Sequence, residues 1–289
     1  MPAQTARTPS AAFIALLTVL SLLAFAGNSL LCRLALRQTT IDADSFTVIR
    51  LLSGALVLAA LMWVRGGLPQ RAGRWPAGFS LFAYAATFSY AYVTLTAGIG
   101  ALLLFGAVNA TMIGYGLWRG EAMRLLQWTG VAIAFTGLIG LTLPGLTAPP
   151  LTGALLMIVA GIAWGAYSLF GRGARNPLAE TAGNFLRAVP FALLLAALAW
   201  PWQQVDGAGA AYSVASGAVT SGLGYAIWYK AQPHLRAAIA ASLQLSVPVI
   251  AAAGGILLLD ESLSLRLVFS SAAILGGIAL VILGRRDAV

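Results

Sequence analysis

Charged side chains are scarce in this sequence of 289 residues: Asp, Glu, Lys and Arg make up 9% of it, whereas apolar residues make up 60%. A soluble domain carries about 25% charged residues, so this composition cannot cover a surface exposed to water. The single cysteine and single histidine exclude a disulfide framework and leave no pair of imidazoles for zinc. We therefore expect an integral membrane protein without a metal or other cofactor.

The residues needed for ATP hydrolysis and for common catalytic centres are also missing. The sequence has no G-x-x-x-x-G-K-[ST] motif and one lysine, Lys230, which excludes a Walker-type loop. All eight Asp and Glu residues fall in predicted loops or at helix ends, so no carboxylate relay lies deep in a membrane span. One histidine and these acids cannot assemble a catalytic triad or a carboxylate dyad. We expect no enzyme.

Uncharged runs give the number of membrane crossings. Forty-four residues between Arg74 and Arg119 carry no charge; as one helix they would measure about 66 Å, roughly twice the hydrocarbon core. A hairpin is predicted at the glycines of 96–100. The next uncharged run is divided at the proline-rich segment 143–150. The prediction is an all-α membrane protein with ten spans, near residues 11–32, 44–64, 75–96, 98–118, 123–143, 151–171, 180–199, 208–229, 236–258 and 262–283.

The two halves of the sequence repeat each other. Residues 50–63 align without gaps on 187–200 with eight identities in fourteen positions, and an Arg and a Trp are among them. Residues 24–35 also match 163–174, with Arg33 opposite Arg172. Because apolar composition alone does not place Arg and Trp at one spacing, the first two spans of each half are predicted to be duplicates.

The rear of each half follows the same pattern. Glu121 and Gly137 correspond to Glu261 and Gly277 at one constant offset. We therefore predict two repeats of five helices, 1–145 and 150–289. Because five is odd, the second repeat enters the bilayer from the opposite side, as in the inverted repeats of many secondary transporters.

Basic residues predict the orientation. With the N-terminus inside, cytoplasmic segments hold twelve Lys and Arg residues, whereas the opposite side holds three, Arg33, Arg37 and Arg266. Both termini are therefore expected in the cytoplasm. This distribution accounts for the net charge of +9 without a basic domain that would bind nucleic acid.

The paired blocks resemble the drug/metabolite transporter (DMT) superfamily and its EamA-type exporters of the bacterial inner membrane. The resemblance also rests on Gly120 and Glu121, which precede the fifth span, and on the segment 259–261, which precedes the tenth. The sequence looks closest to aromatic amino acid exporters of the YddG type. The resemblance implies a substrate cavity formed by spans 1, 3, 4, 6, 8 and 9, with spans 5 and 10 at the periphery.

Polar and aromatic residues fall mainly in those implied cavity helices. Trp164, Tyr167 and Ser168 share one helix face because their spacing is i, i+3 and i+4. Spans 5 and 10, by contrast, are almost entirely small and aliphatic. The candidate substrate-binding residues are Asn28, Tyr84, Thr87, Tyr90, Asn109, Trp164, Tyr167, Ser168, Tyr225 and Gln244.

Several of these residues have a structural interpretation as well. Amides such as Asn28, Asn109 and Gln244 also serve as hydrogen-bond links between membrane helices. Trp and Tyr concentrate at membrane interfaces. We expect that location for Trp63, Trp200, Trp202, Trp228 and Tyr229.

Arg50 and Arg187 are repeat mates within spans, where a charge is costly and is usually paired or functional. The preferred interpretation is that each supports a gate near its own face of the membrane. Anchoring through a side chain that reaches the headgroups and direct binding of a substrate carboxylate are the alternatives. Glu121 and Glu261 are expected to cap helix starts.

These observations predict a secondary transporter that exports amino acids, aromatic or other neutral ones, and related metabolites by alternating access. Neutral amides and aromatic faces suit a neutral or zwitterionic solute with an apolar side chain. A small-molecule substrate and the lipid bilayer are the expected partners, and the chain is expected to act as a monomer. The alternatives are an exporter of other metabolites or drugs of the same superfamily, and a passive channel.

Overall fold

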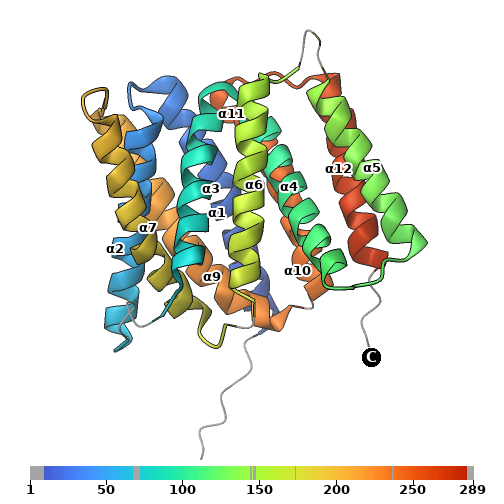
Figure 1. The fold of residues 1–289 in the computed structure, drawn as a ribbon, viewed down its shortest axis with the longest axis horizontal. Coiled ribbons are helices and arrows are strands. Elements are labelled where there is room, and N and C mark those ends of the chain that lie inside the picture. Colours follow the sequence, from blue (N-terminus) through green and yellow to red (C-terminus); the bar gives the residue numbers. More distant parts are fainter. Residues whose placement is uncertain are drawn as a thin grey trace, which may run out of the picture.

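The computed structural model describes residues 10–67, 72–143, 145, 148–172, 174–235 and 237–284, and the regular structure of these residues is helical. Long helices lie side by side, and consecutive ones run in alternate directions (Figure 1). The elements are α1 (Ala11–Gln38), α2 (Ala43–Val64), α3 (Trp75–Thr94), α4 (Ala97–Trp118), α5 (Leu125–Thr142), α6 (Leu151–Phe170), α7 (Pro177–Ala199), α8 (Gly207–Val214), the π-helix η2 (Ala215–Leu223), α9 (Gly224–Ala231), the 3₁₀ turn η3 (Gln232–His234), α10 (Ala237–Gln244), α11 (Ser246–Leu259) and α12 (Leu265–Gly284).

Ten passes follow from this order, as predicted. Eight of the described helical segments are long and apolar enough to cross a membrane. The other two passes are α3 and the continuous run of α8, η2 and α9, which together replace the span expected at 208–229. The expected break at 143–150 is confirmed by the end of α5 and the start of α6. The hairpin expected at the glycines of 96–100 is instead made by Leu95 and Thr96, and Gly98 and Gly100 lie inside α4, whose start is fixed by the Thr96 cap.

Polar side chains at the loops fix where several helices begin. The Asp42 carboxylate accepts the Ser45 N–H at 2.8 Å at the start of α2. Asn176 accepts from Ala179 at 3.1 Å at the start of α7, and Asp206 accepts from Gly209 at 2.9 Å at the start of α8. Each oxygen satisfies an amide that has no partner inside its helix.

Helices α5 and α12 pack together at one edge of the bundle, away from α2 and α7 (Figure 1). Glycines allow their close contact: a Cβ atom added to Gly130 would lie 2.5 Å from the Gly277 carbonyl oxygen. This edge position agrees with the small and aliphatic composition of both helices. The start of α1 and the end of α12 lie at the same end of the bundle (Figure 1).

The two halves of the chain share one interior. Helix α3 packs against α6 and α7 of the second half, whereas η2 and α9 pack against α1 of the first half. Large apolar side chains on the outside remain exposed, among them Leu56, Leu257 and Phe269 at 69%, 80% and 70%. Apolar surface of this extent is expected where lipid replaces water.

Candidate functional site

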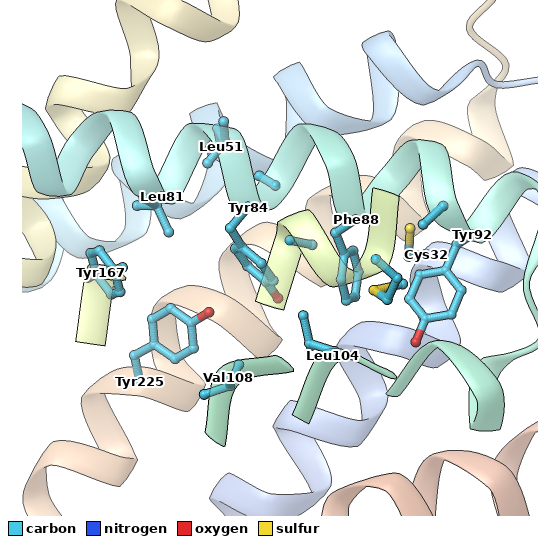
Figure 2. Close-up of a cluster of buried hydrophobic side chains, with 14 of the residues drawn as sticks. Cys32, Leu51, Leu81, Tyr84, Phe88, Tyr92, Leu104, Val108, Tyr167 and Tyr225 are labelled. Atoms are coloured by element: carbon cyan, nitrogen blue, oxygen red, sulfur yellow. The ribbon is translucent and has the colours of Figure 1, made fainter. Parts of the chain in front are cut away.

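An aromatic cluster occupies the interior where the two halves meet. The ring centroid of Trp164 on α6 lies 4.8 Å from that of Tyr84 on α3, and 5.2 Å from those of Tyr167 and Tyr225. Figure 2 shows the three tyrosines arriving from three different helices. The structure therefore brings together four of the residues proposed from the sequence, and we call Tyr84, Trp164, Tyr167 and Tyr225 the aromatic cluster.

Asn28 joins this cluster to α1 and to the π-helix. Its Nδ2 donates to the Tyr84 hydroxyl at 3.1 Å, and its Oδ1 accepts from Ser216 at 2.7 Å and from Thr220 at 3.4 Å. The side chain is 6% exposed. The amide therefore uses both ends to connect three helices, which is the structural use of an amide, while it stands against the aromatic cluster.

Arg50 lies beside the same tyrosine. Its Nη2 donates to the Tyr84 hydroxyl at 3.1 Å, and its guanidinium carbon lies 5.1 Å from the Tyr84 ring centroid and 4.9 Å from that of Phe88. These are cation–π distances. With 2% of the residue exposed, the side chain does not reach the membrane surface, so anchoring to headgroups does not describe it.

The π-helix η2 reaches α2 through two glycines. A Cβ atom on Gly217 would overlap the Arg50 carbonyl oxygen and the Ser53 hydroxyl, and one on Gly54 would lie 3.1 Å from the Gly217 carbonyl oxygen. Helices pack this closely only where a side chain is absent. A π-helical turn is frequently found at functional sites, and here it carries the two hydroxyls that hold Asn28.

A separate cavity of about 510 Å³ opens at the end of the bundle where α1 ends and α2 and α6 begin. Tyr90 lines this cavity and not the aromatic cluster, and its hydroxyl donates to the Asp44 carboxylate. Asp42 and Gln204 also line it, and the Asp42 amide donates to the Gln204 carbonyl at 3.1 Å. The structure therefore divides the predicted residues between two places.

Four further candidates make no hydrogen bond to a side chain of the aromatic cluster. Thr87 and Ser168 donate to carbonyl oxygens one turn earlier in their own helices, at 2.7 and 2.8 Å. Asn109 likewise donates to Phe105 at 2.8 Å. Gln244 is half-buried at the end of α10, where Leu245 interrupts the pass before α11 begins.

Arg187 lies in a setting different from that of its repeat mate Arg50. It donates to the Gly183 carbonyl at 2.9 Å and to the carbonyl of Ala72 in the loop between α2 and α3. Its guanidinium therefore ties α7 to a loop at one end of the bundle, whereas Arg50 lies in the interior.

One expectation from the sequence needs correction. Trp228, expected at the membrane interface, is 5% exposed and packs edge-on against Phe25 at 5.8 Å, because α9 turns this face towards α1. Glu261, expected to cap a helix start, accepts the amide of Ala97, the first residue of α4, at 2.8 Å. It also forms an ion pair with Arg33 at 3.2 Å. Trp63, Trp200 and Trp202 are exposed, at 78%, 72% and 76%.

Several residues of the site escaped the sequence analysis. Phe25 and Phe185 lie against Tyr225 at 5.9 and 6.2 Å, but phenylalanine is common in every span and carries no distinct signal. Ser216 and Thr220 could have been noticed, because their spacing of four places both hydroxyls on one helix face. Among the described residues no group of His, Cys, Asp and Glu could hold a metal ion.

Comparison with known proteins gives three results. Residues 151–283 match the EamA-like transporter family. A protein of Pseudomonas aeruginosa described as uncharacterized is 57% identical over 272 residues, which cover 93% of this chain and 94% of that protein. A crystal structure with 19% sequence identity is similar in fold, with a TM-score of 0.66 over 97% of this chain and all of the other.

Proposed function

The chain belongs to the EamA-like transporter family, and from that premise we propose that it exports amino acids across the bacterial inner membrane by alternating access. The family transports small molecules and is not a family of enzymes. The proposal names aromatic or other neutral amino acids as the solutes, as for exporters of the YddG type. The observation that carries it is the aromatic cluster joined to Asn28 between the two halves.

The chemistry of this cluster supports the proposed solute. Aromatic rings offer faces to an apolar or aromatic side chain, and the Asn28 amide with its bound hydroxyls offers neutral hydrogen-bonding groups. A site with many cations would be expected for a sugar phosphate. The described interior contains one buried guanidinium near the cluster, that of Arg50.

Inverted repeats are part of the proposal, and the two glutamates support them. Gly120 and Asp260 both have positive φ, 84° and 52°. The amide of the next residue then donates back to a helix carbonyl, from Glu121 to Gly116 at 3.0 Å and from Glu261 to Gly255 at 3.1 Å. A similar turn therefore occurs after α4 and after α11, which run in opposite directions (Figure 1), although the amide reaches back five residues in the first turn and six in the second.

The loops at the two ends of the bundle support the same symmetry. Near the start of α2, Asp42 accepts the Gln204 amide from the segment that leads into α8. Near the start of α7, Glu180 accepts the Gly73 amide, from the segment that leads into α3, at 3.1 Å. In each case an acidic residue of one half receives the chain that enters the third helix of the other half.

Counterflow across proteoliposomes tests the function. Vesicles containing the full chain are loaded with unlabelled phenylalanine, and labelled phenylalanine is added outside at trace concentration. A carrier accumulates the label transiently above its equilibrium level, whereas a pore equilibrates it without an overshoot. Overshoot supports the proposal. Its absence for every amino acid of an aromatic and aliphatic panel refutes the proposed solute.

Orientation is tested separately, because the proposal places both termini in the cytoplasm. A green fluorescent protein fused to the C-terminus should fluoresce, and alkaline phosphatase at the same position should stay inactive. The same pair fused in the loop between α1 and α2, on the opposite side, should give the reverse result. Active phosphatase at the C-terminus would contradict the orientation and leave the transport test unaffected.

A further inference from the structure

Arg50 is a charged side chain in the interior of the bundle, and no carboxylate of the described residues forms an ion pair with it. The ion pair found among the described residues joins Arg33 and Glu261, which lie elsewhere. The guanidinium of Arg50 instead packs over the uncharged rings of Tyr84 and Phe88. Arginine stays protonated in proteins, and a buried charge is costly unless a partner offsets it. The chain therefore keeps a cation in its interior, and the part of the chain that the structure describes supplies no carboxylate to pair with it.

One terminal nitrogen of this guanidinium has no acceptor. Nη2 donates to Tyr84 at 3.1 Å, whereas Nη1 is buried and has no hydrogen-bond partner in the described part of the chain. An arginine with a purely structural role would direct both terminal nitrogens of its planar guanidinium to acceptors. A buried donor without a partner loses its hydrogen bonds to water and gains no hydrogen bond in the protein. Nη1 is a donor available to a group from outside the chain.

The Tyr84 hydroxyl adds a second donor at the same place. Its oxygen accepts from Asn28 Nδ2 and from Arg50 Nη2, both at 3.1 Å. These two bonds use the lone pairs of the oxygen and leave its own hydrogen to donate. Two neighbouring donors, one of them cationic, match the two oxygens of a carboxylate.

The π-helix presents another unsatisfied group in the interior. The Ser221 hydroxyl is buried and, like Arg50 Nη1, has no partner among the described residues. Its helix meets α2 at Gly217, directly against the backbone of Arg50. Native interiors leave few polar atoms unpaired. Two such atoms on helices in contact are therefore expected where a ligand completes the hydrogen bonding.

We propose that Arg50 and Tyr84 bind the carboxylate of the transported solute. The solute class is then small monocarboxylic acids, amino acids included, whose apolar or aromatic body lies against Trp164 and Tyr225. The ring centroid of Trp164 lies 4.8 Å from that of Tyr84, so the anion and the body have adjacent binding groups. This inference rests on the proposed function, because it requires that the cluster hold a solute.

Matched acids and amides test it in counterflow. The probes are phenylalanine and phenylalaninamide, with leucine and leucinamide and with benzoate and benzamide as further pairs, competing against the labelled acid. Each pair keeps the body and removes the negative charge. The wild-type chain should favour the acid by about tenfold to a hundredfold, as expected for hydrogen bonds to a charged group. Equal competition by acid and amide would overturn the proposal without any variant.

Variants assign the preference to Arg50. Arg50→Gln should bring the ratio of acid to amide close to one, by weakening competition of the acid and not of the amide, and Arg50→Lys should retain part of the preference through its charge. Tyr84→Phe should lower the ratio less than Arg50→Gln. Arg119→Gln makes the same change at an exposed position at the end of α4 and should leave the ratio unchanged.

The outcomes separate this inference from the proposed function. The carboxylate site is overturned if Arg50→Gln leaves the ratio of acid to amide unchanged. If Arg50→Gln does not reach the membrane, an unchanged ratio in both Arg50→Lys and Tyr84→Phe overturns it. Overshoot for an amide and for no acid also overturns it, while transport of small molecules stands. Absence of overshoot for every probe refutes both.

Discussion

Replacing Gly217 by alanine should loosen the contact between η2 and α2 that holds the candidate site together. The added Cβ atom would lie 2.8 Å from the Arg50 carbonyl carbon, whereas ordinary contact begins at 3.4 Å. The Arg50 carbonyl carbon and oxygen belong to the backbone of α2, so a rotation of the Ser53 side chain alone does not relieve the overlap. One of the two helices has to move.

The size of the effect follows from a comparison with Gly27→Ala. Both variants gain about the same helix propensity, roughly 0.5–1 kcal/mol, so this contribution cancels in the difference. The Cβ of Gly27→Ala would lie 3.5 Å from the nearest atom, Thr220 Cγ2, which is ordinary contact. Overpacking costs about 1–3 kcal/mol, so Gly217→Ala should be less stable than Gly27→Ala by about that amount.

Thermal unfolding in detergent, followed by the loss of the monodisperse peak in size-exclusion chromatography, measures this difference. At about 2–4 °C per kcal/mol for a chain of this size class, Gly217→Ala should unfold some 2–12 °C below Gly27→Ala. It should also lower counterflow, because Ser216 and Thr220 move with η2. Equal unfolding temperatures for the two variants would refute the close approach of η2 to α2.

Three further predictions follow from other contacts. Trp164→Ala should reduce counterflow at least tenfold with normal membrane levels, because it removes the centre of the aromatic cluster; Trp118→Ala, at a residue 79% exposed, is the control, and equal activity of the two would remove Trp164 from the site. Glu261→Gln should lower the unfolding temperature, since breaking the buried ion pair with Arg33 costs about 3–5 kcal/mol. Asp260→Asn is the control and should not lower it, because Asn tolerates positive φ; equal stability of the two variants would argue against the ion pair. Gly277→Val should separate α5 from α12 and lower stability by about 1–3 kcal/mol, while Gly276→Val, with nothing within 4 Å of its Cβ, should have a smaller effect in the same unfolding assay.

The apolar composition and the positions of charged residues, glycines and prolines were sufficient to predict the ten passes. Charged residues, glycines and prolines stop apolar helices, so most predicted boundaries agree with the structure within a few residues. The exception is α1, expected to end near residue 32 and observed to reach Gln38. It continues because Arg33 pairs with Glu261 and Arg37 donates to the Leu259 carbonyl at 2.8 Å. Partners from a distant loop are invisible to a local hydropathy argument.

The candidate site was predictable only in part, for a related reason. Residue type identified Asn28, Tyr84, Trp164 and Tyr225, because amides and aromatic rings are distinctive in an apolar span. It could not give the rotation of each helix, which decides whether a hydroxyl such as that of Ser168 meets its neighbours or its own backbone. The π-helical turn was also missed, because small residues such as those of 215–223 are compatible with an α-helix.

The hydrogen bond from Ala97 to Glu261 has a consequence for the synthesis of the protein. The acceptor of the first amide of α4 lies 164 residues later in the chain, so it is synthesised after the donor. At 5–20 residues per second, roughly 10 to 30 s pass between synthesis of the donor and synthesis of its acceptor. During that interval the first amide of α4 has no Glu261 carboxylate to donate to, so a chain whose synthesis stops before residue 261 lacks this bond between its two halves.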